Sequence, residues 1–381
     1  MDNDFVKKVI TFKPGKFVFS YKYDVGKLAP MIVEAKILYQ TVKDLPILPS
    51  LAAGLEEEII RRSIFSTAAI EGNPLPEESV AGIVSQPAEN TNPERAEKEI
   101  QNLKVAYELL MEADLKDPVT ALDENHIRQI HSIITNGLAH EHNTPGLYRN
   151  HMVKVGDADH GGVYTPPKCL ADIETLMREF LGWINSDNIM SLNPILRAGL
   201  AHYYLGLIHP FGDGNGRTAR LIEALLMKSS GIRYVPIMLS NFYYTNIDEY
   251  FRVFSITRRD KEHMVTPFLE FVVKGVIASL YTIKDKIVYF IRQLALRDYY
   301  AFLLKGKKLS GRQHDLLTLL LENRRSFRLT DLFTVSMLRV LYKSVSERTA
   351  RRDLKTLCDL GVLTCKKDIY DLNLQVLGYS N

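Results

Sequence analysis

Cysteine is scarce in this chain, which holds only Cys169, Cys358 and Cys365 and no Cys-x-x-Cys pair. An odd number of widely spaced thiols argues against a disulfide framework, and structural zinc sites need clustered cysteine or histidine ligands. The sequence therefore predicts neither a small disulfide scaffold nor a zinc-ribbon protein. A reducing compartment fits best, and we expect a cytoplasmic protein.

Long apolar runs are missing as well. The run Val276–Leu280 follows a break at Lys274 and Gly275, whereas a helix that spans a bilayer needs about 20 largely apolar residues. The first residues include acids and lack the apolar centre of a signal sequence. We therefore expect no membrane span, no secretory leader and no membrane partner.

What the chain has is an ordinary globular composition, with 46% hydrophobic and 24% charged residues among 381. The net charge of +3 hides an asymmetry, because residues 286–381 hold 18 Lys and Arg against 9 Asp and Glu, and the remainder 30 against 36. A basic module can bind nucleic acid, although a solvated basic face is the commoner explanation. We expect three parts: an N-terminal helical region over 1–115, a core over 116–285 and a separate domain over 286–381.

The spacing of apolar residues predicts a mainly α-helical fold. Residues 5–30 are expected to form an extended lead-in, and a helix over about 52–70 should stop at the Gly-Asn-Pro sequence of 72–74. The stretch 144–167 has Pro and Gly at both ends and short alternating runs, which predicts a β-hairpin. Helices are expected over 194–207 and 215–228.

The last part of the chain predicts a winged helix. A helix over 346–360 is followed by alternating residues that indicate a two-stranded hairpin. This helix places leucines on one face and basic residues on another, a pattern that suits phosphates and major-groove edges. A winged helix that binds protein or only packs explains the pattern equally well. The candidate contacts to DNA are Arg348, Arg351, Arg352 and Lys355.

The segment HPFGDGNGRTAR, residues 209–220, is the most informative of the chain. Its glycines at every second position let the backbone turn tightly and direct N–H groups into one concavity. The helix that follows adds free N–H groups and the positive end of its dipole. Such a nest binds an anion, most simply phosphate. Arg217 and Arg220 lie three residues apart on the first turn and face the same anion.

Two more side chains point to phosphate chemistry. Asp213 inside a phosphate nest needs a cation, and Mg²⁺ held by one carboxylate and phosphate oxygens is the natural one. His209 at the mouth titrates near neutral pH and can take a proton from an incoming hydroxyl. The glycines fit neither a dinucleotide-binding fingerprint, which follows a strand, nor a P-loop, which needs Gly-Lys-Ser/Thr. A plain glycine-rich connection would not need this set of polar residues.

The segment resembles the signature of the Fic family, His-Pro-Phe-x-(Asp/Glu)-Gly-Asn-Gly-Arg-x-x-Arg, at every constrained position. The ends of the 146–167 stretch, Gly-Leu-Tyr-Arg and Tyr-Thr-Pro-Pro, look like those of the family's target-binding flap. The resemblance covers roughly residues 50–275. It implies a Fic helical core with a β-hairpin flap. It also implies a protein adenylyltransferase that moves AMP from ATP to Ser, Thr or Tyr hydroxyls of proteins, with the chain itself among potential targets.

The resemblance also assigns roles within the segment. His209 would be the general base, and Asp213 would hold Mg²⁺ on the α- and β-phosphates. Arg217 would take the β-phosphate and Arg220 the γ-phosphate, while Phe211 would be a buried anchor. Asn215 and the amides beside it would hold the α-phosphate. The full set expected to bind ATP and its phosphates is Gly214, Asn215, Gly216, Arg217, Thr218 and Arg220.

A second motif, Thr67-x-x-x-Glu71-Gly72, resembles the family's inhibitory sequence (Ser/Thr)-x-x-x-Glu-(Gly/Asn). From physics alone, a carboxylate at a helix C-terminus is opposed by the dipole, so it either points into water or meets a cation from elsewhere. The resemblance implies that Glu71 pairs with Arg220 and blocks the γ-phosphate position. In some relatives the same glutamate serves removal of AMP, so the net direction of catalysis stays open.

The residues that would bind the nucleotide base are less clear from the sequence. The resemblance suggests Tyr250 and Phe251 for the adenine pocket, although two core aromatics on a helix explain them equally well. Val155 and Gly156 of the flap could border the nucleotide or form an ordinary strand.

Histidines elsewhere are expected to be structural. His202 lies seven residues before His209, on the same helical face, but has no carboxylate or histidine partner at metal-ligand spacing. His126 and His131 are assigned to packing as well.

Three functions stay open at this level. The first is an adenylyltransferase restrained by Glu71. The second is a DNA-binding transcriptional regulator whose Fic core senses a nucleotide, and the third is a Fic enzyme that uses another donor or removes AMP. An intact His209 favours an enzyme, because a sensor needs no base. The sequence leaves the target and the oligomeric state open, a homodimer included.

Overall fold

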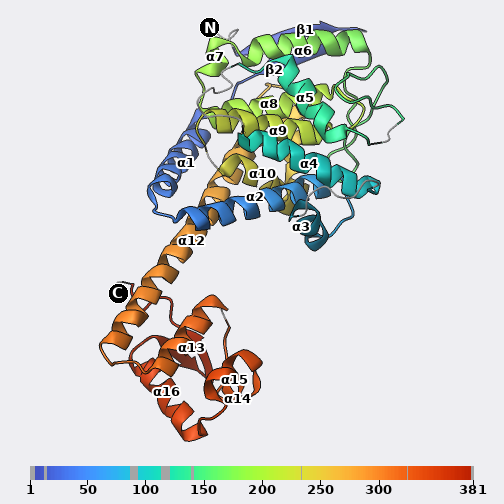
Figure 1. The fold of residues 1–381 in the computed structure, drawn as a ribbon. Helices are drawn as coiled ribbons and strands as arrows, with labels where there is room; N and C mark the ends of the chain where they lie inside the picture. The colour runs from blue at the N-terminus through green and yellow to red at the C-terminus, as the bar shows by residue number, and fades with distance from the viewer. Residues whose placement is uncertain are drawn as a thin grey trace. The chain divides into compact units, whose positions relative to one another are not determined.

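The computed structural model describes residues 5–12, 15–85, 93–112, 121–138, 141–232, 234–323 and 325–378. It forms two compact units, Met1–Asp44 with Pro49–Lys284 and Leu45–Leu48 with Asp285–Asn381 (Figure 1). We call them the N-terminal unit and the C-terminal unit. The expected division at residue 115 lies outside the described residues. The helices on either side of it belong to the same unit.

The fold is mainly α-helical, as the sequence predicted. The helices that begin in the N-terminal unit are α1 (Val25–Asp44), α2 (Pro49–Ile70), α3 (Glu77–Ser85), α4 (Arg95–Glu112), α5 (Glu124–Thr135), α6 (Leu170–Ile184), α7 (Asp187–Met190), α8 (Pro194–Ile208), α9 (Asn215–Ser229), α10 (Val235–Thr245), α11 (Ile247–Arg259) and α12 (Thr266–Lys305).

Helices α8 and α9 form the centre of the N-terminal unit. They pack against each other, and α5, α4, α2 and α10 pack around α9. Nearly every residue of both helices is buried, which explains the largely apolar sequence of α8. Helix α9 buries polar and charged side chains as well. Helix α8 begins as predicted, because the Asn193 side chain accepts a hydrogen bond from the Ile195 N–H at 2.9 Å and Pro194 stands at the first position.

The N-terminus differs from the extended lead-in that we expected. Strands β1 (Val6–Thr11) and β2 (Gly15–Ser20) pair antiparallel, from Val6 opposite Ser20 to Thr11 opposite Gly15. Phe19 of β2 is fully buried against Trp183 of α6, with ring centroids 5.4 Å apart. Aromatic residues alternate at Phe17, Phe19 and Tyr21, and this period of two was the available signal for a strand.

The predicted hairpin over 144–167 is smaller than expected. Val155 and Tyr164 form a single antiparallel bridge, with N–H···O distances of 2.9 and 2.7 Å. The turn between them contains Gly156, Gly161 and Gly162 at positive φ. These glycines favour a loop over an extended ladder. We call residues 152–166 the flap.

The C-terminal unit follows the predicted order of helices and a hairpin. Its elements are α13 (Gly311–Glu322), α14 (Asp331–Thr334), α15 (Ser336–Tyr342), α16 (Glu347–Asp359), β3 (Leu363–Lys366) and β4 (Ile369–Leu372). Strands β3 and β4 pair antiparallel, and Phe327 bridges to Tyr370. Leucines of α13 and α16 share one buried core with Phe327 and Tyr342. The winged-helix assignment stays a prediction.

Helix α12 is the one described helix that is long and apolar enough to cross a membrane, with an 18-residue window of mean hydropathy 1.3. This differs from our expectation, because Lys274 and Gly275 interrupt the apolar run without making the helix polar. However, 61% of that window is buried inside the protein. A core helix shows the same composition, so the finding is weak evidence for a span.

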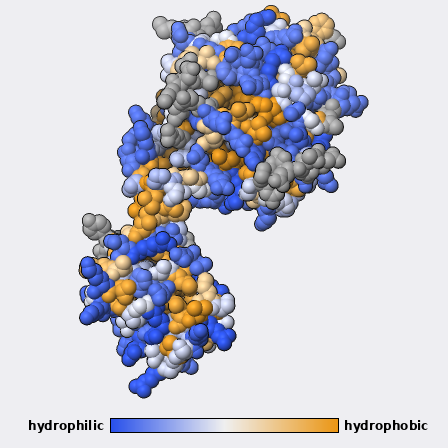
Figure 2. Space-filling view, viewed as in Figure 1, coloured by the Kyte–Doolittle hydropathy of each residue, from blue (hydrophilic) through white to orange (hydrophobic). Residues whose placement is uncertain are grey.

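Figure 2 shows mainly hydrophilic residues on the visible surfaces of the two units, with hydrophobic residues gathered in smaller areas. Some hydrophobic side chains are exposed to solvent. On α1, Val33 and Ile37 are more than half exposed.

Asp353 organises the polar part of the C-terminal core. Its carboxylate is buried and accepts two hydrogen bonds from Arg312, at 2.9 and 2.7 Å, and one from Gln313 at 3.2 Å. We expect Asp353→Ala to destabilise this unit by about 2–3 kcal/mol, because the donors lose a buried charged partner. Hydrogen exchange of the amides of α13 and α16 measures this. Asp359→Ala, at an exposed site on the same helix, is the control, and equal protection in the two variants would contradict the prediction.

Candidate active site

The loop between α8 and α9 is held by side chains that close on its own backbone. Asn215 accepts from the Phe211 N–H and donates to the Phe211 carbonyl, both at 2.9 Å. The Phe211 ring is buried, as predicted, and stacks on His131 with centroids 3.6 Å apart. The amide of Asn215, which we had expected to hold a phosphate, therefore shapes the loop. Its backbone N–H stays available for that role at the start of α9.

Two glycines of the loop meet separate backbone requirements. Gly214 precedes α9 with φ of 76°, in the left-handed region that suits glycine. Gly216 lies so close to the Glu71 carboxylate that a Cβ atom would collide with it. The side chain of Glu71 therefore lies directly over the N-terminal turn of α9, where the nest was predicted to hold phosphate.

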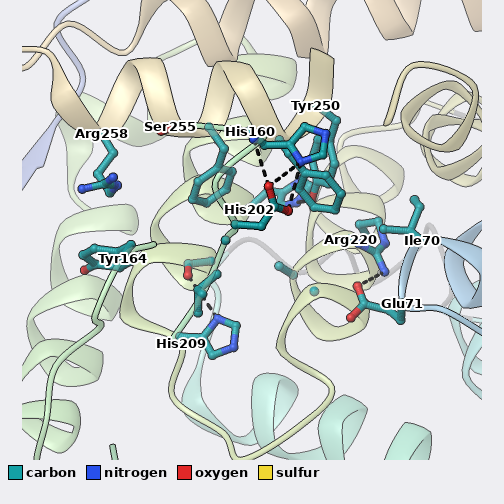
Figure 3. Close-up of a pocket in the computed structure, with 18 of the residues that line it drawn as sticks. Ile70, Glu71, His160, Tyr164, His202, His209, Arg220, Tyr250, Ser255 and Arg258 are labelled. Atoms are coloured by element: carbon teal, nitrogen blue, oxygen red, sulfur yellow. Dashed lines mark hydrogen bonds and ion pairs between the residues drawn. The ribbon is translucent and has the colours of Figure 1, made fainter. Parts of the chain in front are cut away.

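Arg220 is the cation that holds Glu71 there. Its Nη2 donates to Glu71 Oε1 at 2.7 Å and to the Thr67 carbonyl at 3.2 Å, and its side chain is 1% exposed. Removal from water raises the pKa of Glu71, but the charges of Arg220 and Arg217 outweigh this and leave it below the usual value. The pairing that the sequence implied is present in the structure (Figure 3).

The inhibitory motif is anchored behind this pair. The Thr67 hydroxyl donates to Ser240 of α10 at 2.8 Å, and Gly72 ends the helix with φ of 86°. Glu71 is thus fixed from its own helix as well as by Arg220.

Arg217 is buried beside Arg220 and has two acidic partners. It donates to Asp213 Oδ1 at 2.8 Å and to Glu99 of α4 through a short contact. Asn73 donates to the second oxygen of Glu99 at 2.9 Å. The sequence did not single out Glu99. Its only signal was an acid on the polar face of a strongly periodic helix, which a solvated surface explains equally well.

The buried arginines are suited to a polyanion. The Nε atoms of Arg217 and Arg220 are buried, and neither finds a hydrogen-bond partner in the described part of the chain. Buried guanidinium N–H groups without acceptors are rare in folded proteins. Phosphate oxygens would satisfy them and replace the carboxylates that now pair with the two side chains.

Asp213 fits one part of a Mg²⁺ site. Its carboxylate is 23% exposed beside the phosphate nest and interacts with Arg217 and, at 3.5 Å, with Arg95. Mg²⁺ in nucleotide sites is bound by one or two carboxylates together with substrate phosphates. In the described residues no group of three or more His, Cys, Asp or Glu side chains could hold a metal alone. A metal here would therefore come with the nucleotide.

His209 follows the last turn of α8 with φ of 50°, an uncommon conformation for a residue other than glycine. Its Nδ1 lies 3.3 Å from the Gly206 carbonyl. Because a carbonyl only accepts, Nδ1 carries the proton and Nε2 is left with the lone pair. Burial lowers the pKa of His209 to about 4, with the charge of Arg149 acting in the same direction. The ring is therefore neutral near pH 7, as a general base must be.

Arg149 holds the backbone around His209. It donates to the carbonyls of His209, His151 and Pro167 at 2.6–2.7 Å. These contacts join the residues at both ends of the flap to the loop between α8 and α9. This arginine is the last residue of the Gly-Leu-Tyr-Arg end, whose resemblance to the family's flap implied no role for it.

A cavity of about 300 Å³ brings these groups together. Its lining includes Gly216 and the expected flap residues Val155 and Gly156. Figure 3 shows His209, Arg220 and Glu71 at the same cavity. Tyr250 and Phe251 of α11 also line it. Both proposed adenine-pocket residues therefore lie at the same cavity as His209, the expected general base. The flap is tied to α11 by His160, which lies between Asp157 and Asp248 at 2.9 and 3.2 Å.

Residues 121–227 match the model of the Fic/DOC family. These residues form a Fic domain. Among curated relatives, the protein adenylyltransferase Fic of Drosophila erecta is 42% identical over 94 residues, which are 25% of this chain and 17% of that protein. The protein adenylyltransferase fic-1 of Caenorhabditis elegans is 44% identical over 78 residues, 20% of this chain and 15% of that protein. The matched segment is thus about a sixth of these relatives.

Solved structures show the same fold over more of the chain. A Fic family protein from Desulfovibrio desulfuricans G20 aligns with a TM-score of 0.55 at 19% identity, over 93% of this chain and 97% of that one. Fic-1 from C. elegans aligns with a TM-score of 0.53 at 24% identity, over 68% of this chain and 72% of that one. The Fic fold therefore includes helices outside the matched segment.

The histidines of the Fic domain, which we expected to be structural, make polar contacts in addition to packing contacts. His202 has a buried carboxylate partner, Glu223 of α9, at 3.0 Å and contacts the Tyr250 hydroxyl at 2.9 Å. His131 contacts the Asp213 carbonyl at 2.9 Å, and His126 forms part of the capping box of α5. Spacing along the sequence could not reveal Glu223, because it lies on the next helix.

The candidate DNA contacts belong to the C-terminal unit. All four belong to α16 of the C-terminal unit and are exposed, and Arg351 pairs with Glu347 at 2.6 Å.

The depressed pKa of His209 gives a direct test. Between about pH 4 and 6.5 the unfolded chain binds a proton that the folded Fic domain does not, so protonation opposes folding in this window. We expect the His209 ring, followed by NMR and assigned with His209→Ala, to stay neutral from pH 8 to about 5. A short peptide that carries the same residue should titrate near 6.5. Titration of folded His209 near 6.5 would contradict the assignment.

Proposed function

We propose that this protein transfers AMP from ATP to hydroxyl side chains of proteins, and that Glu71 restrains the reaction. The observation that carries the proposal is that a neutral histidine and the Arg220–Glu71 pair line one cavity. The names of the curated relatives support the reaction class. Those relatives extend far beyond the matched segment, so the activity of the whole chain is an inference from the site.

The chain's residues suggest a division of labour. The phosphates of ATP would lie on the first turn of α9, with Arg217 and Arg220 exchanging carboxylates for phosphate oxygens. His209 Nε2 would accept the proton of the target hydroxyl as its oxygen forms a bond to the α-phosphorus. The bond from that phosphorus to the bridging oxygen would break, and pyrophosphate would leave. Positioning and charge neutralisation carry most of such a reaction.

Mg²⁺ is part of this proposal. Asp213 would hold it, and the bound ion would neutralise charge on the phosphates. Arg217 and Arg95 neutralise Asp213 without nucleotide, so arrival of the phosphates would have to redistribute these contacts.

Glu71 would act as a brake because it occupies the Arg220 side of the nest. We expect Glu71→Gly to raise incorporation of label from ATP labelled on the α-phosphate by about tenfold or more, since losing 1.4 kcal/mol of competition is already a factor of ten. Glu57→Gly, at an exposed position of α2, is the control for a general effect of replacing glutamate by glycine in that helix. Labelled protein, the chain itself included, is the readout in the presence of Mg²⁺.

His209→Ala in the Glu71→Gly background should lower labelling by about 100-fold or more, as removal of a general base does. Equal labelling with and without Glu71 would reject the brake. Equal labelling with and without His209 would reject the base. Labelling in none of the variants would favour another donor or removal of AMP, which the release of AMP from a modified protein would reveal.

A second candidate function is DNA binding by the C-terminal unit, and the distribution of exposed charge on α16 favours it. Its basic side chains are exposed, whereas Ala350, Leu354 and Leu357 on the opposite side are buried. Lys366 and Lys367 at the β3–β4 turn are also exposed. A basic helix beside a basic hairpin suits the phosphates and groove of a duplex.

The triple variant Arg348→Gln, Arg352→Gln and Lys355→Gln should weaken binding of a labelled duplex by about tenfold or more at low salt, because three phosphate contacts are lost. The matched control removes three exposed lysines of the same unit, Lys305, Lys307 and Lys308. Fluorescence anisotropy with competitor DNA measures both. Equal losses in the two triple variants would indicate only a general basic surface, and binding by neither parent nor variants would reject this function.

A further inference from the structure

A second cavity, of about 260 Å³, lies beside the one that holds His209. Tyr164 of the flap and Arg258 of α11 line both cavities. The guanidinium of Arg258 lies over the Tyr164 ring, 4.8 Å from its centroid, and Figure 3 shows the two side chains next to each other. This stacked pair therefore forms a wall that the two cavities share. We call the second one the side cavity.

Helix α8 presents adjoining faces to the two cavities. His202, Gly206 and His209 line the first, whereas Tyr203 and Leu207 line the side cavity. Successive residues of a helix are turned by about 100°, so these two rows are neighbours. At about 1.5 Å a residue, Leu207 and Tyr203 lie about 3 and 9 Å from His209 along the helix axis. A polypeptide whose hydroxyl lies at His209 is therefore close to the side cavity.

The side cavity is positively charged. Lys16 of β2 and Arg258 line it, and no Asp or Glu of the described residues does. Neither basic side chain has an ion pair or a hydrogen bond with another described residue. The carboxylate of Asp260, two residues after Arg258, accepts from the N–H groups of Glu262 and Met264 at 2.9 and 3.0 Å. It thus stabilises its own loop and leaves the charge of the cavity without compensation.

The floor of the side cavity holds an unused hydrogen-bond donor. Tyr203 is 3% exposed, yet its hydroxyl has no hydrogen-bond partner in the part of the chain that the structure describes. Burial raises the pKa of this hydroxyl well above its ordinary value, so the hydroxyl stays protonated. Buried polar groups without partners are rare. Lys16 and His263 are exposed, so the cavity extends from an exposed mouth to this buried donor.

We propose that the side cavity binds an acidic side chain of the protein target, a Glu or Asp close in sequence to the hydroxyl that is modified. The carboxylate would accept from Arg258 and from the Tyr203 hydroxyl, and its methylene groups would lie against the buried rings of Phe17 and Tyr204. An extended chain covers about 3.3 Å a residue, so an acid within about three residues of the hydroxyl can reach the cavity.

This inference rests on the proposed function, which places the target hydroxyl at His209, and it adds a substrate class to it. The shared wall of Tyr164 and Arg258 favours a side chain of the target over a free anion, because one polypeptide would then contact both cavities. A charge-assisted hydrogen bond to a guanidinium also favours a carboxylate over the neutral amide of the same shape.

The experiment uses the full chain with Glu71→Gly and a library of short peptides. Each peptide has one central Ser, Thr or Tyr, and each of the three positions on either side holds Ala, Gln, Glu or Lys. Peptides retained by the immobilised protein, and peptides labelled from ATP carrying the label on its α-phosphate, are sequenced by mass spectrometry. We expect Glu to be enriched over Gln by about tenfold at one flanking position, as a hydrogen bond to a charged group gives.

Variants of the cavity connect this preference to its residues. Arg258→Gln should abolish the enrichment, and Arg258→Glu should replace it by a preference for Lys, which a general loss of structure cannot produce. Tyr203→Phe should reduce the enrichment of Glu by about threefold or more. Arg252→Gln, which removes an exposed arginine of the same helix outside both cavities, should leave it unchanged. Each preference is a ratio within one protein, so changes in overall activity cancel.

The outcomes separate this inference from the proposed function. Glu enriched at no position, equally at every position, or equally with Arg258→Gln overturns the inference. Binding of free glutarate that Arg258→Gln abolishes, with no preference among peptides, identifies a free anion and overturns it as well. Retention of Glu peptides that depends on Arg258, by a protein that transfers no AMP, supports the acidic site and rejects the transferase. Transfer of AMP to peptides without regard to Glu does the reverse.

Discussion

The packing of the N-terminal unit around α9 depends on the neutralisation of two buried guanidinium groups. The side chains of Arg217 and Arg220 are 4% and 1% exposed, and an unpaired charge in that position costs several kcal/mol. Their partners come from three places in the sequence: Glu71 directly follows α2, Glu99 lies on α4 and Asp213 precedes α9. The need to neutralise the start of α9 therefore helps to bring α2 and α4 against it, and a phosphate that took over these arginines would have to replace the same carboxylates.

In the function that we propose, restraint by Glu71 and binding of phosphate would both depend on which anions neutralise the two arginines. Without a polyanion, Glu71 and Glu99 stabilise the fold by pairing with the arginines. With a polyanion, the same carboxylates become competitors. Asn73 contacts Glu99 only two residues after Glu71, so a movement of the end of α2 that withdrew Glu71 would also disturb the partner of Arg217. One movement of this segment could therefore separate both arginines from their carboxylate partners.

The loop over 209–220 and its pairing with Glu71 could be predicted because their chemistry is local or carried by a recognised pattern. Helix boundaries around Asn193 and Gly214 followed from capping and from glycine at positive φ. The β1–β2 hairpin was missed because its stability comes from packing of Phe19 on Trp183, a contact over a long sequence separation. Glu99 and Glu223, the carboxylate partner of His202, were missed for a related reason. Each lies on a helix whose own pattern is that of ordinary packing, and its role exists only after α4, α8 and α9 come together.

Trp183 is the single tryptophan of the chain, and it is buried in the N-terminal unit between Phe19 and Tyr204. Its fluorescence should therefore follow melting of the N-terminal unit, while unfolding of the C-terminal unit, which has a hydrophobic core of its own, should leave that signal unchanged. Tryptophan emission and far-ultraviolet dichroism should then give separate transitions whenever the two units differ in stability. A nucleotide that stabilises the Fic domain would shift only the first.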